Sequence, residues 1–136
     1  MIVDAGPLYA YVDADDAHHA ACLELLETHP GPLIVPTLVI TEVAYLLATR
    51  LGWEAEARFL GDLGSGAFVL EPLHPADPLR MVKLVAQYHD LPLGTVDASV
   101  IAAAERLDIT EIGTVDGRHF SVVRPSHVDA FRLQPS

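Results

Sequence analysis

Short apolar runs alternate along the chain with longer segments in which apolar positions recur at helical spacing. The runs fall at residues 1–4, 33–35, 68–70 and 111–115, and we predict a strand at each. The segments between them predict helices over residues 6–12, 17–28, 36–51, 53–63, 75–88 and 96–107. Short continuous strands that alternate with helices indicate a parallel sheet covered on both faces. We therefore predict an α/β fold, a three-layer α/β/α sandwich with a central parallel sheet.

The pattern is weaker at two places. A fifth strand is predicted at either residues 120–124 or residues 128–133, on the two sides of Pro125, and we favour residues 131–133 slightly. Asp16 follows an acidic turn and is predicted to cap the helix that begins at Ala17, because aspartate is a preferred N-cap.

Four carboxylates stand almost alone in apolar stretches of the chain, and they are Asp4, Glu42, Asp97 and Asp116. An isolated ionised carboxylate near a core is costly to desolvate unless a cationic partner or a metal ion compensates. The chain has only 8 Lys and Arg against 19 Asp and Glu, so cationic side chains are scarce. This imbalance suggests a bound divalent cation.

The predicted fold brings these carboxylates to one edge of the sheet. Asp4 and Asp116 each follow a predicted strand, and ligands of open parallel sheets bind outside the carboxyl ends of the strands. Glu42 lies in the second turn of the helix that follows the second strand, and Asp97 lies at the start of another helix. We expect all four to converge.

A cluster of carboxylates suits Mg²⁺ or Mn²⁺, which prefer oxygen ligands. One or two such ions would activate water and stabilise the leaving oxygen of a phosphodiester. Taken singly, Asp4 and Asp97 could also be helix N-caps, and Asp116 before Gly117 could be a turn residue. Glu42 is least explained by structure alone, because it is too far into its helix to be a cap.

Composition limits the remaining function classes. The 136 residues fit one domain, residues 1–136, and no apolar run approaches the roughly 20 residues of a membrane span. The formal charge of −11 argues against broad, sequence-blind binding of nucleic acid. Cys22 is the only cysteine, which excludes an internal disulfide framework and favours a cytoplasmic protein.

Four segments in order resemble the PIN-domain ribonucleases and, within them, the VapC toxins of type II bacterial toxin–antitoxin pairs. They are residues 2–8 (IVDAGPL), 35–43 (VPTLVITEV), 96–104 (VDASVIAAA) and 114–120 (TVDGRHF). The similarity runs nearly end to end. It implies a parallel α/β/α sandwich and Mg²⁺- or Mn²⁺-dependent endoribonuclease activity on structured RNA such as tRNA or ribosomal RNA. It also implies a homodimer, and a heterotetramer or larger assembly with a small cognate antitoxin.

The resemblance also assigns residues. Asp4, Glu42, Asp97 and Asp116 would be the acidic quartet that holds the metal and catalyses cleavage, with Asp4 and Asp97 as the most direct ligands. Thr114 matches a hydroxyl position that supports the site. Many relatives have Ser or Thr two residues after the first Asp, where this chain has Gly6.

Other residues have both structural and functional interpretations. Arg118 and His119 could contact an RNA phosphate or could form ordinary surface contacts. A group of larger apolar side chains could line a groove for the antitoxin, although core is the favoured role for each. This group is Tyr9, Tyr11, Tyr45, Trp53, Phe59 and Leu60.

Two other function classes compete with the nuclease. A phosphatase of similar layout is disfavoured because Gly6 stands where a second Asp would be required. A regulatory, receiver-like or protein-binding module could hold Mg²⁺ without nuclease activity. The receiver form needs a late catalytic lysine, and no lysine follows Lys83.

Overall fold

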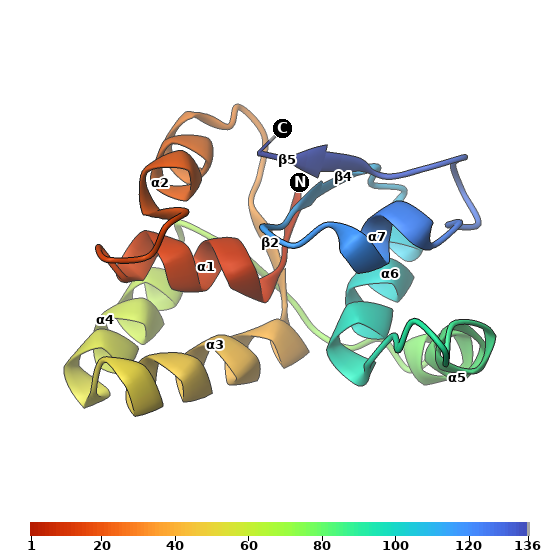
Figure 1. Cartoon of the computed structure of the whole chain (residues 1–136), viewed down its shortest axis with the longest axis horizontal. Helices are drawn as coiled ribbons and strands as arrows, with labels where there is room; N and C mark the ends of the chain where they lie inside the picture. The colour runs from red at the N-terminus through yellow and green to blue at the C-terminus, as the bar shows by residue number, and fades with distance from the viewer. Residues whose placement is uncertain (136) are drawn as a thin grey trace.

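A parallel sheet of five strands lies at the centre of the computed structural model, which describes residues 1–135 (Figure 1). The strand order is β3-β2-β1-β4-β5, and every neighbouring pair is parallel. The chain adds β2 and β3 on one side of β1 and then β4 and β5 on the other, which creates a topological switch point between β1 and β4. The strands are β1 (Ile2–Val3), β2 (Ile34–Pro36), β3 (Val69–Glu71), β4 (Glu111–Gly113) and β5 (Arg132–Gln134).

Helices cover both faces of this sheet. Figure 1 shows α1 to α4 grouped on one side and α5 to α7 on the other. Helix α1 packs on α2 and α3, and α5 packs on α6. Within residues 1–135 no helix has both the length and the apolar character needed to cross a membrane. The helices are α1 (Ala5–Val12), α2 (His19–Thr28), α3 (Thr37–Arg50), α4 (Trp53–Gly64), α5 (Asp77–Gln87), α6 (Thr95–Leu107) and α7 (Arg118–Val122).

The core is centred on β1, β4 and the middle of α6. Ile2, Val3 and Ile112 are fully buried, and residues 98–104 of α6 are buried without interruption. Four of those seven helical residues are alanines, so α6 can pack closely against neighbours on all sides. This tight packing fixes the first turn of α6, which carries Asp97.

The predicted fold class is confirmed, with the fifth strand at the favoured end of the tail. The alternative strand at residues 120–124 is wrong, because this segment begins within α7 and its Phe120 points into the core. A short apolar run cannot distinguish a strand from a buried helical turn by periodicity alone. The predicted cap at Asp16 is also wrong, since α2 begins at His19 and Asp16 instead accepts a hydrogen bond from the backbone N–H of His18.

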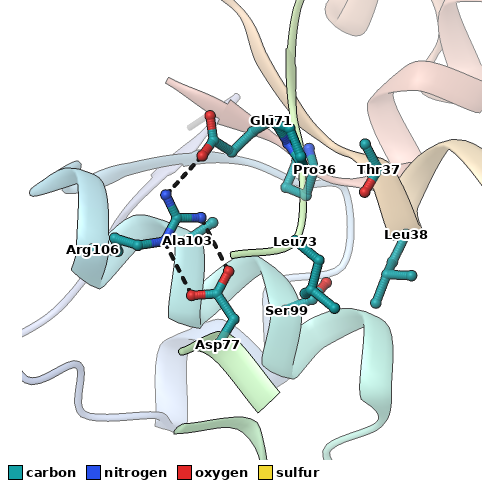
Figure 2. Close-up of a pocket in the computed structure, with 10 residues that line it drawn as sticks. Pro36, Thr37, Leu38, Glu71, Leu73, Asp77, Ser99, Ala103 and Arg106 are labelled. Atoms are coloured by element: carbon teal, nitrogen blue, oxygen red, sulfur yellow. Dashed lines mark hydrogen bonds and ion pairs between the residues drawn. The ribbon is translucent and has the colours of Figure 1, made fainter. Parts of the chain in front are cut away.

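A largely buried ion-pair network joins β3, α5 and α6 (Figure 2). The Arg106 guanidinium donates from Nε and Nη2 to the two carboxylate oxygens of Asp77, both at 3.0 Å. Its Nη1 donates to Glu71 at 2.7 Å. The Asp77 side chain is only 5% exposed, so the network compensates a charge that would otherwise be costly to bury. It also anchors the C-terminal half of α6.

Candidate active site

Asp4 and Asp116 lie at the topological switch point of the sheet, beyond the ends of β1 and β4. The backbone N–H of Asp4 donates to the carbonyl of Gly113 at 2.9 Å, which fixes Asp4 beside the end of β4. Asp4 is at the N-cap position of α1, but its side chain makes no capping hydrogen bond. The capping interpretation is wrong for Asp97, because Gly94 is the N-cap of α6 and Asp97 lies inside its first turn.

One cavity of about 300 Å³ is lined by all four predicted carboxylates, Asp4, Glu42, Asp97 and Asp116. They come from the end of β1, the middle of α3, the start of α6 and the loop after β4. The structure therefore brings the quartet together as predicted. Glu42 and Asp116 are exposed, so their side chains reach solvent at the cavity's edge.

Asp4 is the carboxylate whose charge is most costly. Burial raises the pKa of Asp4 to about 7, and repulsion from Asp97 and Glu42 adds to the rise, while the Ala5 amide and the Thr114 hydroxyl oppose it. Partial loss of hydration and the charge of Asp97 likewise raise the pKa of Glu42, although Glu42 is open to solvent. Like charges are thus held together without sufficient compensation.

Two of the acids are paired with α7. Asp97 contacts Nδ1 of His119 through Oδ2 at 2.6 Å. The guanidinium of Arg118 donates from Nη2 to Oδ2 of Asp116 at 2.6 Å and from Nε to Oδ1 at 2.9 Å. These bonds lower the pKa of Asp116 to about 2. The backbone N–H of Arg118 also donates to Asp116 Oδ1 at 3.2 Å, so the predicted turn role of Asp116 coexists with its place in the cavity.

The donor chemistry fits a hard divalent cation, because five carboxylates line the cavity, the quartet and Asp16, against one arginine. Among residues 1–135, no three Asp, Glu, His or Cys side chains stand close enough to enclose an ion as they are placed. Asp97 and Asp116 are engaged instead by His119 and Arg118. The residue types therefore fit a metal site, while Asp97 and Asp116 are held by His119 and Arg118.

The family model for the PIN domain matches residues 1–124. The chain belongs to the PIN-domain family. It is also 36% identical over 135 residues to "Ribonuclease VapC26" of Mycobacterium tuberculosis, which spans 99% of this chain and 100% of the relative. The family predicted from the four sequence segments is confirmed.

Two crystal structures share the fold of this PIN domain. VapC20 of Mycobacterium tuberculosis, described as a sarcin–ricin loop cleaving toxin, matches with a TM-score of 0.84 and 21% identity over 94% of this chain and 98% of that one. FitAcB of Neisseria gonorrhoeae matches with a TM-score of 0.61 and 15% identity over 88% of this chain and 89% of that one. At these identities the likeness concerns the fold.

Thr114 lies between two acids of the PIN-domain cavity. Its hydroxyl donates to Asp4 Oδ2 at 3.4 Å and lies 3.3 Å from the carbonyl oxygen of Asp116. Thr114 itself is 5% exposed. It is therefore placed to hold Asp4 relative to the loop after β4.

At residue 6 of this PIN domain there is no room for a side chain. A Cβ at residue 6 would overlap Cγ2 of Val115, which occupies the space beside the first turn of α1. We expect Gly6→Ser to lower the free energy of unfolding by about 1–3 kcal/mol, because the side chain would overpack this contact. Chemical denaturation of the metal-free protein measures the loss.

The Gly6→Ser effect has two controls. Adding Val115→Ala should recover most of the lost stability, because it removes the obstructing methyl group. Gly61→Ser in α4, where a Cβ meets open space, should change stability by less than about 1 kcal/mol. Equal losses at Gly6 and Gly61 would contradict the steric explanation.

Sequence reasoning missed three polar or charged residues that line the cavity beside the quartet: Tyr9, Asp16 and Arg50. Arg50 had a detectable signal, because Glu42, Leu46 and Arg50 recur every four residues and share one face of α3. Tyr9 and Asp16 had none, since Tyr9 lies on α1 and Asp16 in the turn before α2, and only tertiary packing brings them to the cavity.

Proposed function

We propose that this PIN domain is a metal-dependent endoribonuclease and the toxin of a type II toxin–antitoxin pair. The single observation that carries the proposal is the convergence of four carboxylates on one cavity at the switch point of the sheet. The 36% identity to a ribonuclease over nearly the whole chain supports RNA as the substrate. It also favours an enzyme over a regulatory module that only holds Mg²⁺.

Asp4 and Asp97 would be the most direct ligands of Mg²⁺ or Mn²⁺, with Glu42 and Asp116 completing the acidic set. A bound ion of this kind supplies an activated water and stabilises developing charge on the phosphodiester. The chain's own residues position it: Thr114 orients Asp4, and the packed first turn of α6 orients Asp97. Arg118 and His119, at the same edge, are proposed contacts for RNA phosphate.

Arg118 and His119 already contact negatively charged groups at this edge. Both residues now bind acids of the quartet, and the Arg118 side chain is 82% exposed. Arg118 can therefore exchange its carboxylate partner for a phosphate at little cost in desolvation. His119 is less exposed and is held against Asp97, so a role in orienting that ligand also fits its position.

We propose that a cognate antitoxin covers apolar side chains on α3 and α4. Tyr45, Trp53 and Leu60 are 68%, 72% and 48% exposed, so the core role favoured for them is wrong. The core role is confirmed for Tyr9 and Phe59, which are buried, while Tyr11 is partly buried and packs against the core. A basic antitoxin segment would suit the net charge of −11.

The assembly we propose is a homodimer, or a heterotetramer or larger complex with antitoxin, acting on RNA in the cytoplasm. Helix α5 exposes Leu79, Val82 and Val85, a further apolar surface suitable for a subunit contact. A cytoplasmic site of action agrees with a substrate such as tRNA or ribosomal RNA and with the single buried cysteine.

The test of the proposed function is cleavage of total cellular RNA with and without a chelator. We expect EDTA to reduce the initial rate at least about 100-fold, and added Mg²⁺ or Mn²⁺ to restore it. Asp97→Asn should reduce the rate by a similar factor, because it removes a charged ligand of the proposed ion. Gel electrophoresis of end-labelled RNA measures both effects.

A thermal-shift assay separates loss of metal binding from loss of folding. Mg²⁺ should raise the melting temperature of the wild type, because a ligand at 100 times its Kd stabilises by about 2.7 kcal/mol. The same addition should leave Asp97→Asn nearly unchanged, while circular dichroism reports an intact fold. Full cleavage in EDTA would refute the metal-dependent mechanism.

A further inference from the structure

Arg50 is the sole cationic side chain among the described residues that line the acidic cavity. It is the last residue of α3 and lies eight residues, about two helical turns, after Glu42 on the same face. Leu46 lies between them. At 1.5 Å per residue, Arg50 is about 12 Å along the helix from Glu42. The cavity therefore holds one positive charge, about two turns of α3 away from Glu42.

Arg50 is held in place by an aromatic ring. Its guanidinium carbon lies 5.1 Å from the centroid of Tyr9, which is a cation–π contact. Tyr9 is only 6% exposed, and its hydroxyl donates to Asp13 at 2.5 Å. The ring is thus a rigid support. The contact with this ring restricts the position of the Arg50 guanidinium at the cavity.

The Arg50 guanidinium has no anionic partner within the part of the chain that the structure describes. No ion pair joins the Arg50 guanidinium to a carboxylate of residues 1–135, although several carboxylates line the cavity. A side-chain hydrogen bond from Arg50 opposes the rise in the pKa of Tyr9 that Asp13 and burial cause. The nearby charge of Arg50 contributes to a lowered pKa of Asp13, behind the larger effects of the Tyr9 and Asp15 hydrogen bonds. Because Arg50 is exposed and has no carboxylate partner, its guanidinium is available for an external anion.

We infer that Arg50 binds a backbone phosphate of the RNA that flanks the scissile one, and so positions the substrate strand across the cavity. This inference rests on the proposed nuclease function. The fork geometry of arginine matches the oxygens of a phosphate, and a charged hydrogen bond of this type is stronger than a neutral one. On a chain of charge −11, a preformed cationic contact supplies the local attraction that the overall surface lacks.

The experiment measures RNA binding separately from cleavage. In an Asp4→Asn background, which blocks turnover, the affinity for a short labelled single-stranded RNA is followed by fluorescence anisotropy in Mg²⁺. Arg50→Gln should weaken binding about tenfold. It should also reduce the slope of log affinity against log salt by about 0.7, the loss of one phosphate contact on a single strand.

Arg58→Gln is the matched control, because Arg58 is an exposed arginine on α4 outside the cavity and the charge change is the same. We expect it to alter affinity by about twofold at most and to leave the salt slope unchanged. Arg50→Lys keeps the charge without the fork, so it should retain the salt slope and recover only part of the affinity.

The outcomes separate this inference from the proposed function. In the cleavage assay, Arg50→Gln should raise KM about tenfold with a smaller change in kcat, because the contact binds substrate away from the reacting atoms. Cleavage by the wild type with equal effects of Arg50→Gln and Arg58→Gln would overturn the role of Arg50 alone. Absence of cleavage by the wild type would count against the proposed function. If Arg50→Gln fails to fold, Arg50→Lys decides: wild-type affinity would overturn bidentate phosphate binding.

Discussion

Asp4→Asn is expected to abolish RNA cleavage while making the metal-free protein more stable at neutral pH. Cleavage should fall at least about 100-fold, because the variant removes the most enclosed ligand of the proposed ion. Stability should rise because Asp4 is a destabilising charge: burial, together with repulsion from Asp97 and Glu42, raises its pKa from 3.8 to about 7. Function and stability thus oppose each other at this residue.

The sign of the pH dependence follows from this raised pKa. Between pH 3.8 and about 7, the folded protein holds the Asp4 proton more tightly than the unfolded chain does. The contribution of Asp4 to the free energy of unfolding of the protein therefore falls as pH rises through this window. At about 1.4 kcal/mol per pH unit, a shift of this size costs up to about 4 kcal/mol above pH 7.

Denaturant unfolding in EDTA across pH 4 to 8 measures the effect. The stability of Asp4→Asn relative to the wild type should increase with pH and level off above about 7. Asp15→Asn makes the same chemical change at an exposed residue outside the cavity, and its difference from wild type should stay within about 0.5 kcal/mol. A pH-independent difference for Asp4→Asn would exclude the proposed charge penalty.

The second large effect is expected at the buried ion-pair network. Asp77→Ala should lower the free energy of unfolding by about 3–5 kcal/mol, because it leaves the partly buried Arg106 with only Glu71 as a partner. It also removes the carboxylate that accepts a hydrogen bond from the backbone N–H of His74, three residues before α5 begins. Urea unfolding of the metal-free protein measures the loss.

The exposed ion pair of α7 provides the matched comparison. Asp116→Ala also leaves an arginine without its bidentate carboxylate, but these side chains are 56% and 82% exposed. Its effect on stability should be below about 1 kcal/mol, because exposed pairs contribute little. A double variant that replaces Asp77 and Arg106 with apolar residues of similar volume should regain much of the loss. Equal costs for Asp77→Ala and Asp116→Ala would refute the role of burial.

The sequence by itself determined the fold class and the four acids of the candidate site. Buried parallel strands need continuous apolar runs, and a helix needs its own period, so both patterns are local and can be read from the chain. Asp4 and Glu42 were visible because charges are rare in such runs. The order of these elements then implied a common edge, since parallel strands end on the same side of a sheet.

Only the tertiary structure decided which isolated charges are buried and which groups they contact. It placed Glu42 at the solvent edge, paired Asp116 with Arg118, and enclosed Asp77 beside Arg106. It also set Arg50 against Tyr9, from two helices far apart in sequence. Burial and Coulomb energy depend on distances across the folded chain, and no local period encodes them. The chemistry of each acid therefore follows from its neighbours in space.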